Sequence, residues 1–336
     1  MAYQTGTASN QEDLMQAFYD FAVDEGWTGN IFSAANDWCA INNGTEFFQF
    51  RWDNNNGIGI FHSTAFVNTS TAPGNHTGSS GLGSIDSSAP YNSTIPDVST
   101  STFASACQQI RVNNTAITAY HFFTPASGQQ YIHMAVERSP GTFEHLSVGT
   151  INKRGTWTGG GYSSGSRGTT GTSFSIETAA FGIGANNRGR TMFAMRAEGL
   201  PNQIAAGRWL SAAASTTSLS LSDGDDLAGN ERGAVFVCAA GQGLSGPFLG
   251  MPADPMAGLV PLFPMELYYM DNPVSNDQRF ILLGYIPGAL TMNMRYYNPG
   301  QEFTVGGNTY MVFPPSQKGS AGRGNGNRGI AYLKVV

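Results

Sequence analysis

Charged side chains are scarce in this chain of 336 residues. They make up 12% of the sequence, and 17 Lys and Arg against 23 Asp and Glu leave a formal net charge of −6. That share is about half of what is usual in a globular domain. No run of Lys or Arg forms a basic face, and in residues 318–328 the cations Lys318, Arg323 and Arg328 are diluted among glycines. We expect a solvated loop there, and the composition does not favour a nucleic-acid partner.

Cysteine is rare, and long apolar runs are missing. Cys39, Cys107 and Cys238 are odd in number and far apart, so they match no metal spacing and cannot form a complete disulfide framework. We expect buried thiols in a protein that assembles in the cytoplasm. No apolar run approaches the ~20 residues that span a bilayer. Residues 1–6 show neither the basic start nor the apolar core of a secretory signal, so we expect neither membrane contact nor signal-directed export.

Sequence motifs for catalysis and ligand binding are also missing. The histidines are His62, His76, His121, His133 and His145. None has the spacing of a zinc site, and we expect each to be a hydrogen-bonded sheet residue. No Gly-x-Ser-x-Gly elbow or Gly-Lys-Ser/Thr loop occurs. We therefore expect no enzyme, cofactor, metal or small-molecule substrate, although carboxylate pairs of a glycoside hydrolase form in space and leave a hydrolase open.

One acidic stretch could hold a cation. Asp223, Asp225 and Asp226 place carboxylates two residues apart, as calcium loops do. No Glu follows at the distance that would close the coordination, and Asp-Gly is a common turn. We expect a turn, and cation binding at these residues stays open.

The abundant residues favour strands and tight turns over helices. The chain has 43 glycines, and Ser, Thr and Asn crowd the uncharged remainder. One helix stands out over residues 9–25, with Ser9 as N-cap and Glu12 as its capping-box partner. Apolar residues at helical spacing follow, namely Leu14, Met15, Phe18, Phe21 and Ala22. Gly26 ends the helix, and Trp27 is expected to pack beneath it.

Elsewhere the apolar residues recur with the period of two that is typical of strands. Residues 46–62 predict a hairpin. Further strands are expected at 116–123, 131–137, 144–151, 191–196, 234–238, 280–285, 290–297, 303–305, 310–313 and 330–335. The continuous apolar positions of residues 131–136 indicate burial on both faces. Turns are expected at Pro287-Gly288, Pro299-Gly300 and Gly306-Gly307.

The sequence thus predicts a mainly β fold of antiparallel sandwich- or barrel-like domains with one N-terminal α-helix. Residues 1–154 would form a helix plus a β-domain with a long polar loop at 68–102. Residues 155–255 would form a Gly-rich middle region, whose stretch 155–171 marks a boundary or an extended arm. Residues 256–336 would form a C-terminal β-domain.

In this C-terminal β-domain, strand alternation separates two faces. We expect Met292, Met294 and Tyr296 to face the core. The opposite face consists of Thr291, Asn293 and Arg295. It carries almost no charge, so we expect it to be buried against a neighbouring subunit.

Three stretches of sequence carry a resemblance. The first is residues 1–8, which lead into the helix ending at Gly26-Trp27. The second is residues 144–149 with residues 152–160. The third runs from Gly284 through Asn298-Pro299-Gly300-Gln301 and residues 306–310 to Tyr332. Together they resemble uncharacterised virion proteins of tailed bacteriophages that are assigned to the tail, neck or baseplate.

The resemblance implies a non-enzymatic structural component of the virion, in the tail, the head–tail neck or the baseplate. Such a protein acts by oligomeric assembly in the host cytoplasm, and its partners are other virion structural proteins and copies of itself. The family supplies no catalytic residues. An alternative is a receptor- or carbohydrate-binding module, for which Trp157, Tyr162 and Trp209 could form a sugar platform unless they are core aromatics.

Overall fold

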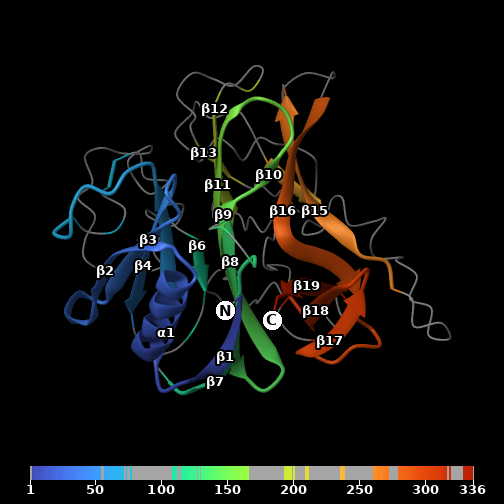
Figure 1. Cartoon of the computed structure of the whole chain (residues 1–336), viewed down its shortest axis with the longest axis horizontal. Coiled ribbons are helices and arrows are strands. Elements are labelled where there is room, and N and C mark those ends of the chain that lie inside the picture. The colour runs from blue at the N-terminus through green and yellow to red at the C-terminus, as the bar shows by residue number, and fades with distance from the viewer. Residues whose placement is uncertain are drawn as a thin grey trace, which may run out of the picture.

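The protein is built from stacked antiparallel sheets. A computed structural model describes residues 2–53, 57–71, 73, 76–77, 108–110, 112, 115–126, 128, 130–165, 193–198, 200, 209–211, 235–238, 260–271, 279–315, 318 and 328–335. These residues form three sheets and one α-helix (Figure 1). The predicted class, mainly β with sandwich-like antiparallel sheets and an N-terminal helix, is confirmed. The sheets formed by the described strands are open, so they do not close into a barrel.

The central sheet has the strand order β1-β7-β8-β9-β11-β12-β13. Its strands are β1 Tyr3–Ala8, β7 Ile117–Phe123, β8 Tyr131–Ser139, β9 Thr142–Thr150, β11 Thr158–Gly165, β12 Phe193–Glu198 and β13 Trp209–Ser211. Along β8, Ile132, Met134 and Val136 join one apolar cluster, whereas Ala135 joins another on the opposite face. The predicted burial of residues 131–136 on both faces is therefore confirmed.

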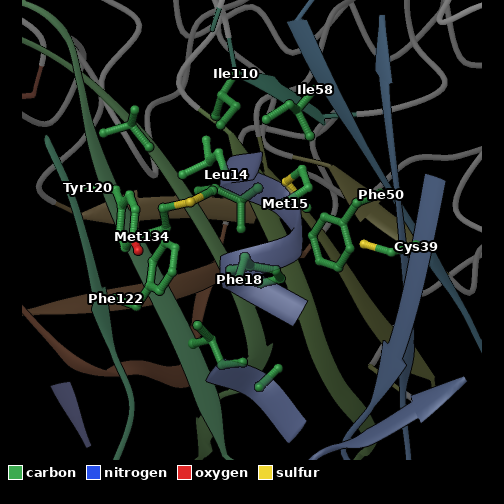
Figure 2. Packing of buried hydrophobic residues seen from close by; sticks show 14 of the residues in the cluster. Leu14, Met15, Phe18, Cys39, Phe50, Ile58, Ile110, Tyr120, Phe122 and Met134 are labelled. Carbon is green, nitrogen blue, oxygen red and sulfur yellow. The ribbon is translucent and has the colours of Figure 1, made fainter. Parts of the chain in front are cut away.

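The helix-side sheet covers one face of the central sheet. Its strands, in spatial order, are β2 Thr28–Ser33, β3 Trp38–Asn42, β4 Phe47–Asp53, β5 Gly57–Ser63 and β6 Gln108–Ile110. Helix α1, Gln11–Asp24, packs against both sheets, and its Phe18 ring lies 5.0 Å from that of Phe50 and 5.7 Å from that of Phe122 (Figure 2). Strands β5 and β6 contact β11 directly. The predicted hairpin at 46–62 is present as β4 and β5.

The helix begins one residue later than predicted. Asn10 is the N-cap in place of Ser9, and the Asp13 N–H donates to its Oδ1 at 2.9 Å. The Ser9 N–H in turn donates to Asp13 Oδ2 at 3.2 Å. Asn caps a helix as well as Ser does, so this reciprocal pair replaces the expected one with Glu12. At the other end Gly26 has φ 88°, and Trp27 is buried beneath the helix as predicted.

The C-terminal sheet covers the opposite face of the central sheet. Its order is β14-β15-β16-β19-β18-β17, and the short strand β10 also pairs with β16. The strands are β10 Asn152–Lys153, β14 Val235–Cys238, β15 Phe263–Asp271, β16 Arg279–Asn293, β17 Gln301–Val305, β18 Asn308–Phe313 and β19 Arg328–Lys334. Phe313 and Tyr332 of this sheet pack on Phe123 of the central sheet. Together the three sheets make a three-layered stack (Figure 1).

The turn predicted at Pro287-Gly288 is wrong, because β16 continues through it. Met265 of β15 pairs with Ile286, whereas Pro264 pairs with Leu290, so residues 287–289 form a bulge. Pro287 has no N–H to give to the ladder, which suits a bulge and not a regular strand position. The bulge bends β16 (Figure 1). The turns predicted at Pro299-Gly300 and Gly306-Gly307 are confirmed.

Strand β16 ends at Asn293, before the predicted position 297. Met292 and Met294 are buried in a small cluster, as expected. The Tyr297 N–H then donates to the Met294 carbonyl at 2.9 Å, and this turn leaves Tyr296 47% exposed instead of in the core. Thr291 is 1% exposed. The polar face was predicted to be available for burial against a neighbouring subunit. That prediction is wrong at Thr291, because this residue is already buried within its own chain.

Strand β11 lies within the Gly-dense stretch that was expected to be a boundary or an arm. It sits inside the central sheet between β9 and β12, and so joins residues on both sides of position 154. A Cβ added at Gly161 would lie 2.5 Å from Glu46 Cδ and 2.6 Å from His62 Cε1, so this close approach requires glycine. Most of the predicted loop at 68–102 and of residues 318–328 lies outside the described residues. The division into three parts stays a prediction.

Replacing Phe18 with alanine should lower the free energy of unfolding by about 3–5 kcal/mol, because its ring fills the space between two sheets. Denaturant titration measures the loss. Val23→Ala on the same helix is the control and should change stability by less than about 0.5 kcal/mol, because Val23 is 41% exposed. Equal effects of the two substitutions would contradict the placement of α1 between the layers.

Candidate functional site

Buried polar side chains between the layers are the candidate functional groups. His121, His133 and His145 lie on the neighbouring strands β7, β8 and β9 and face the C-terminal sheet. His62 lies on β5, on the other side of the central sheet. These four histidines were predicted to be hydrogen-bonded sheet residues, and each has a hydrogen bond to another part of the protein.

His133 is held at both ring nitrogens. Its Nε2 lies 2.8 Å from the Pro287 carbonyl oxygen and therefore donates to it. Its Nδ1, 2.6 Å from Ser147 Oγ, must then accept the serine proton. The Ser147 oxygen accepts in turn from the Tyr162 hydroxyl at 2.9 Å. A single chain of donors thus runs from β11 through β9 and β8 to the bulge of β16.

His145 makes a second link of the same kind. Its Nε2 donates to the Pro314 carbonyl oxygen at 2.9 Å, so its Nδ1 accepts from the Tyr332 hydroxyl at 2.9 Å. His121 Nδ1 is hydrogen-bonded to the Tyr3 hydroxyl, also at 2.9 Å. The first two links fix the tautomer of each ring, because a carbonyl oxygen can only accept. They tie the central sheet to residues that flank or belong to the C-terminal sheet.

Burial determines the protonation of these groups. It lowers the pKa of His133 from 6.5 to about 3, and those of His121 and His145 to about 4. Burial likewise raises the pKa values of the Tyr162 and Tyr332 hydroxyls. All three imidazoles are therefore neutral near pH 7.

Ser147 beside His133 has the composition of a nucleophile–base pair. Ser147 is only 2% exposed, however, and its hydroxyl is engaged on both sides. The second nitrogen of His133 donates to a main-chain carbonyl and not to a carboxylate. In this arrangement the pair holds layers together, and the geometry gives a substrate no access to the serine.

A second polar cluster lies on the other face of the central sheet. Glu46 precedes β4, and its Oε2 accepts from His62 Nε2 at 2.8 Å. Arg196 of β12 reaches the same carboxylate, with Nη2 at 2.5 Å and Nε at 3.0 Å from Oε1. Arg196 also lies 3.5 Å from Glu198. The cluster joins the helix-side sheet to the central sheet.

The charges of this cluster are those of a buried ion pair beside a neutral imidazole. Burial by itself would raise the pKa of Glu46, but the bonds from His62 and Arg196 outweigh it and lower that pKa below its ordinary value. Burial lowers the pKa of His62. Sequence reasoning missed Glu46 and Arg196, because 150 residues separate them and neither lies in a motif.

The proposed sugar platform is wrong for two of its three residues. Trp157 and Tyr162 are 9% and 0% exposed and belong to the core, and Trp157 Nε1 donates to the Arg154 carbonyl at 2.8 Å. The side chain of Trp209 and residues Asp223, Asp225 and Asp226 lie outside the described part of the chain. Cys39 is a buried free thiol, as predicted.

The last histidine, His76, stacks on Phe66 with ring centroids 4.6 Å apart. Its Nδ1 accepts from the Val67 N–H at 3.1 Å. Within the described ranges, no group of three or more His, Cys, Asp or Glu is arranged to hold a metal ion. Likewise, no described helix has the length and apolar character needed to cross a membrane.

The free energy of unfolding should fall as the pH drops from about 6.5 toward 5. Below pH 6.5 the unfolded chain takes up protons at its histidines, whereas His121, His133 and His145 stay neutral in the folded chain until about pH 3–4. Each therefore adds a slope of up to about 1.4 kcal/mol per pH unit. Denaturant titrations at pH 7.5, 6.5, 5.8 and 5.0 measure it.

His133→Gln serves as the matched variant for this slope. The glutamine amide can still donate to the Pro287 carbonyl but does not titrate, so the slope should decrease by up to about 1.4 kcal/mol per pH unit. The titrations stop at pH 5 so that they report the histidines alone. Glu46, whose pKa is lowered in the folded chain, reduces the free energy of unfolding further only below about pH 4.5. An unchanged slope in the variant would contradict the neutral, buried state of His133.

Arg196→Leu should lower the free energy of unfolding by about 3 kcal/mol, because it leaves the buried Glu46 carboxylate without its cationic partner. Lys334→Leu is the matched control. It breaks an ion pair of similar length, 2.6 Å, but its partner Glu302 is 45% exposed, so the loss should stay below about 1 kcal/mol. Equal losses in chemical denaturation would show that the Glu46 cluster does not hold the layers together.

Comparison with known proteins identifies no family for this chain. No protein-family model matches it, and no curated protein matches it. Its function therefore has to be inferred from the arrangement of its own residues.

Proposed function

We propose that the chain is a non-enzymatic structural component of a tailed-phage virion, in the tail, the head–tail neck or the baseplate, acting by oligomeric assembly. The observation that carries this proposal is that the buried polar side chains of the central sheet are engaged in hydrogen bonds within the protein. His133 and His145 of the central sheet bond to Pro287 and Tyr332 of the C-terminal sheet and to Pro314 beside it. Ser147 and Tyr162 extend this network within the central sheet. Such bonds produce a rigid body, which is what a repeated structural part requires.

An apolar region on the C-terminal sheet supports assembly. Met292, Met294, Val312 and Ala331 form a small buried cluster. The residues packed around it are only partly buried, namely Val260, Leu262, Leu290, Tyr297, Phe303 and Tyr310. Partly exposed apolar clusters of this kind are typical of contacts between proteins. The low overall charge also makes desolvation of the surrounding surface less costly.

The stretches that resemble phage virion proteins lie together in space. Residues 1–8 contain β1, which pairs with β7 of the central sheet. Residues 152–160 contain β10, and Asn152 and Lys153 pair with Tyr285 and Gly284 of the third stretch. The second and third stretches are therefore hydrogen-bonded to each other, and the first stretch supplies an end strand of the same central sheet before it leads into α1.

Labelling the chain in intact particles tests the proposal. A tagged chain should appear at one fixed ring or layer in electron micrographs of every particle, and particles made without the chain should be incomplete. Tagging a cytoplasmic protein of the same host provides the background. Complete, infectious particles without this chain would contradict the proposal. Binding of the chain to a glycan array, combined with its absence from particles, would favour the carbohydrate-binding alternative.

A further inference from the structure

Strand β17 is one of the two end strands of the C-terminal sheet, as far as the described residues go. It is joined to β18 by the two-residue turn Gly306-Gly307, whose φ values of 58° and 80° are those of a type I′ hairpin. Among the described strands, β18 is its only hydrogen-bonded neighbour. Gln301, Glu302, Thr304 and Val305 are exposed. The outward edge of β17 is therefore accessible to a further strand.

The turn determines which backbone groups point outward. In a two-residue hairpin the flanking residues, here Val305 and Asn308, form a hydrogen-bonded pair, and such pairs alternate along the ladder. Phe303 and Tyr310 form the next hydrogen-bonded pair. Glu302 and Thr304 lie between these pairs, so their N–H and C=O groups point away from β18.

This edge is complementary to itself. When two copies of β17 lie antiparallel with a two-fold axis at Phe303, Glu302 of each copy falls opposite Thr304 of the other. Both pairs are then hydrogen-bonded pairs, which gives about four backbone hydrogen bonds. A register shifted by one residue would place outward groups opposite inward ones. A register centred on Glu302 or on Thr304 would leave only one hydrogen-bonded pair within β17, so the register centred on Phe303 makes the most backbone bonds.

The side chains fit the same register. Phe303 would meet its own copy at a non-hydrogen-bonded position, where side chains approach most closely. Its ring already stacks 5.7 Å from that of Tyr310 and lies 5.2 Å from that of Tyr297, so the aromatic row would continue into the second copy. Glu302 would lie opposite a threonine, and its charge is paired with Lys334 Nζ at 2.6 Å. No like charges would face one another.

Edge strands usually carry protection against such pairing, in the form of Lys, Pro or a bulge. Within Gln301–Val305 there is none of these, and the one charged residue is neutralised within its own chain. We propose that β17 is a self-association edge, to which a second copy of this chain adds its own β17 in antiparallel register centred on Phe303. The proposal rests on the proposed function, because it names one contact through which the chain assembles.

Single cysteine substitutions test the register. Phe303→Cys should give a disulfide-linked dimer under mild oxidation, because a non-hydrogen-bonded pair brings its Cα atoms within disulfide reach. Val305→Cys, at an exposed position two residues away, is the control and should not link to itself. A mixture of Glu302→Cys and Thr304→Cys chains should yield the mixed dimer, and these exposed substitutions leave the apolar cluster intact. The parent chain corrects for linkage through Cys39, Cys107 or Cys238.

Proline at the edge tests the backbone bonds. Thr304→Pro removes an outward N–H and leaves the backbone bonds to β18 in place, and it should weaken self-association measured by sedimentation roughly tenfold or more. It also removes the hydroxyl bond from Thr304 to Thr309 of β18, as does the control Thr304→Val. Thr304→Val keeps the N–H and should associate like the parent. Circular dichroism and thermal unfolding of both variants confirm that the fold is retained.

The outcomes separate this inference from the proposed function. In one outcome the chain is found in particles, Thr304→Pro leaves association unchanged, and Val305→Cys links as readily as Phe303→Cys. That result would overturn the β17 edge and leave the virion role standing. A chain whose Phe303→Cys variant links specifically, but which is absent from particles, would overturn the virion role and support the edge. A strictly monomeric parent without the specific linkage would overturn the edge.

Discussion

The central sheet is covered on both faces, so a polar side chain that it carries there loses its contact with water and costs free energy unless it finds a partner inside the protein. On the face toward α1, β8 carries the apolar side chains of Ile132, Met134 and Val136. On the other face they carry His133 and His145, whose rings combine one donor and one acceptor. Each ring donates to a carbonyl beyond the sheet, at Pro287 and Pro314. The position of the C-terminal sheet follows from these bonds together with the apolar core between the layers.

This requirement also explains the bulge in β16. A regular ladder would direct the backbone groups of residues 287–289 alternately toward β15 and β19, whereas the bulge frees the Pro287 carbonyl for His133. Sequence reasoning took Pro287-Gly288 for a hairpin turn, because the dipeptide commonly makes one. The competing cause was a histidine 154 residues away. The hydrogen bond that the buried His133 ring makes to the Pro287 carbonyl outweighed the local preference of Pro-Gly for a turn.

Much of the fold could be predicted, because the signals were local. Period-two runs located β4, β5, β7, β8 and β9, and paired glycines located the β17–β18 turn. Strands β1, β2 and β3 were missed, since sequences such as Thr28–Ser33 show no clear alternation and owe their pairing to their neighbours. Of the candidate site, the role of four histidines as hydrogen-bonded sheet residues was predicted but their partners were not, and the prediction is wrong for His76, which lies in a bend. The Glu46–Arg196 pair joins strands of different sheets, and nothing in either sequence context marks it.

In a stack of layers, the outermost strands of each sheet keep backbone groups that are free for further hydrogen bonds. The edges of this protein are not equivalent. Strands β1 and β2 are both contacted by α1, and the Tyr19 ring approaches Gly29 so closely that a Cβ there would lie 2.2 Å from its hydroxyl. Strand β17 has no such cover among the described elements. On one of its faces Phe303 stacks with Tyr310, and on the other the charge of Glu302 is paired with Lys334. In a chain with so little charge, such an edge lacks the repulsion that keeps most exposed strands apart, and contact with an identical edge costs little desolvation.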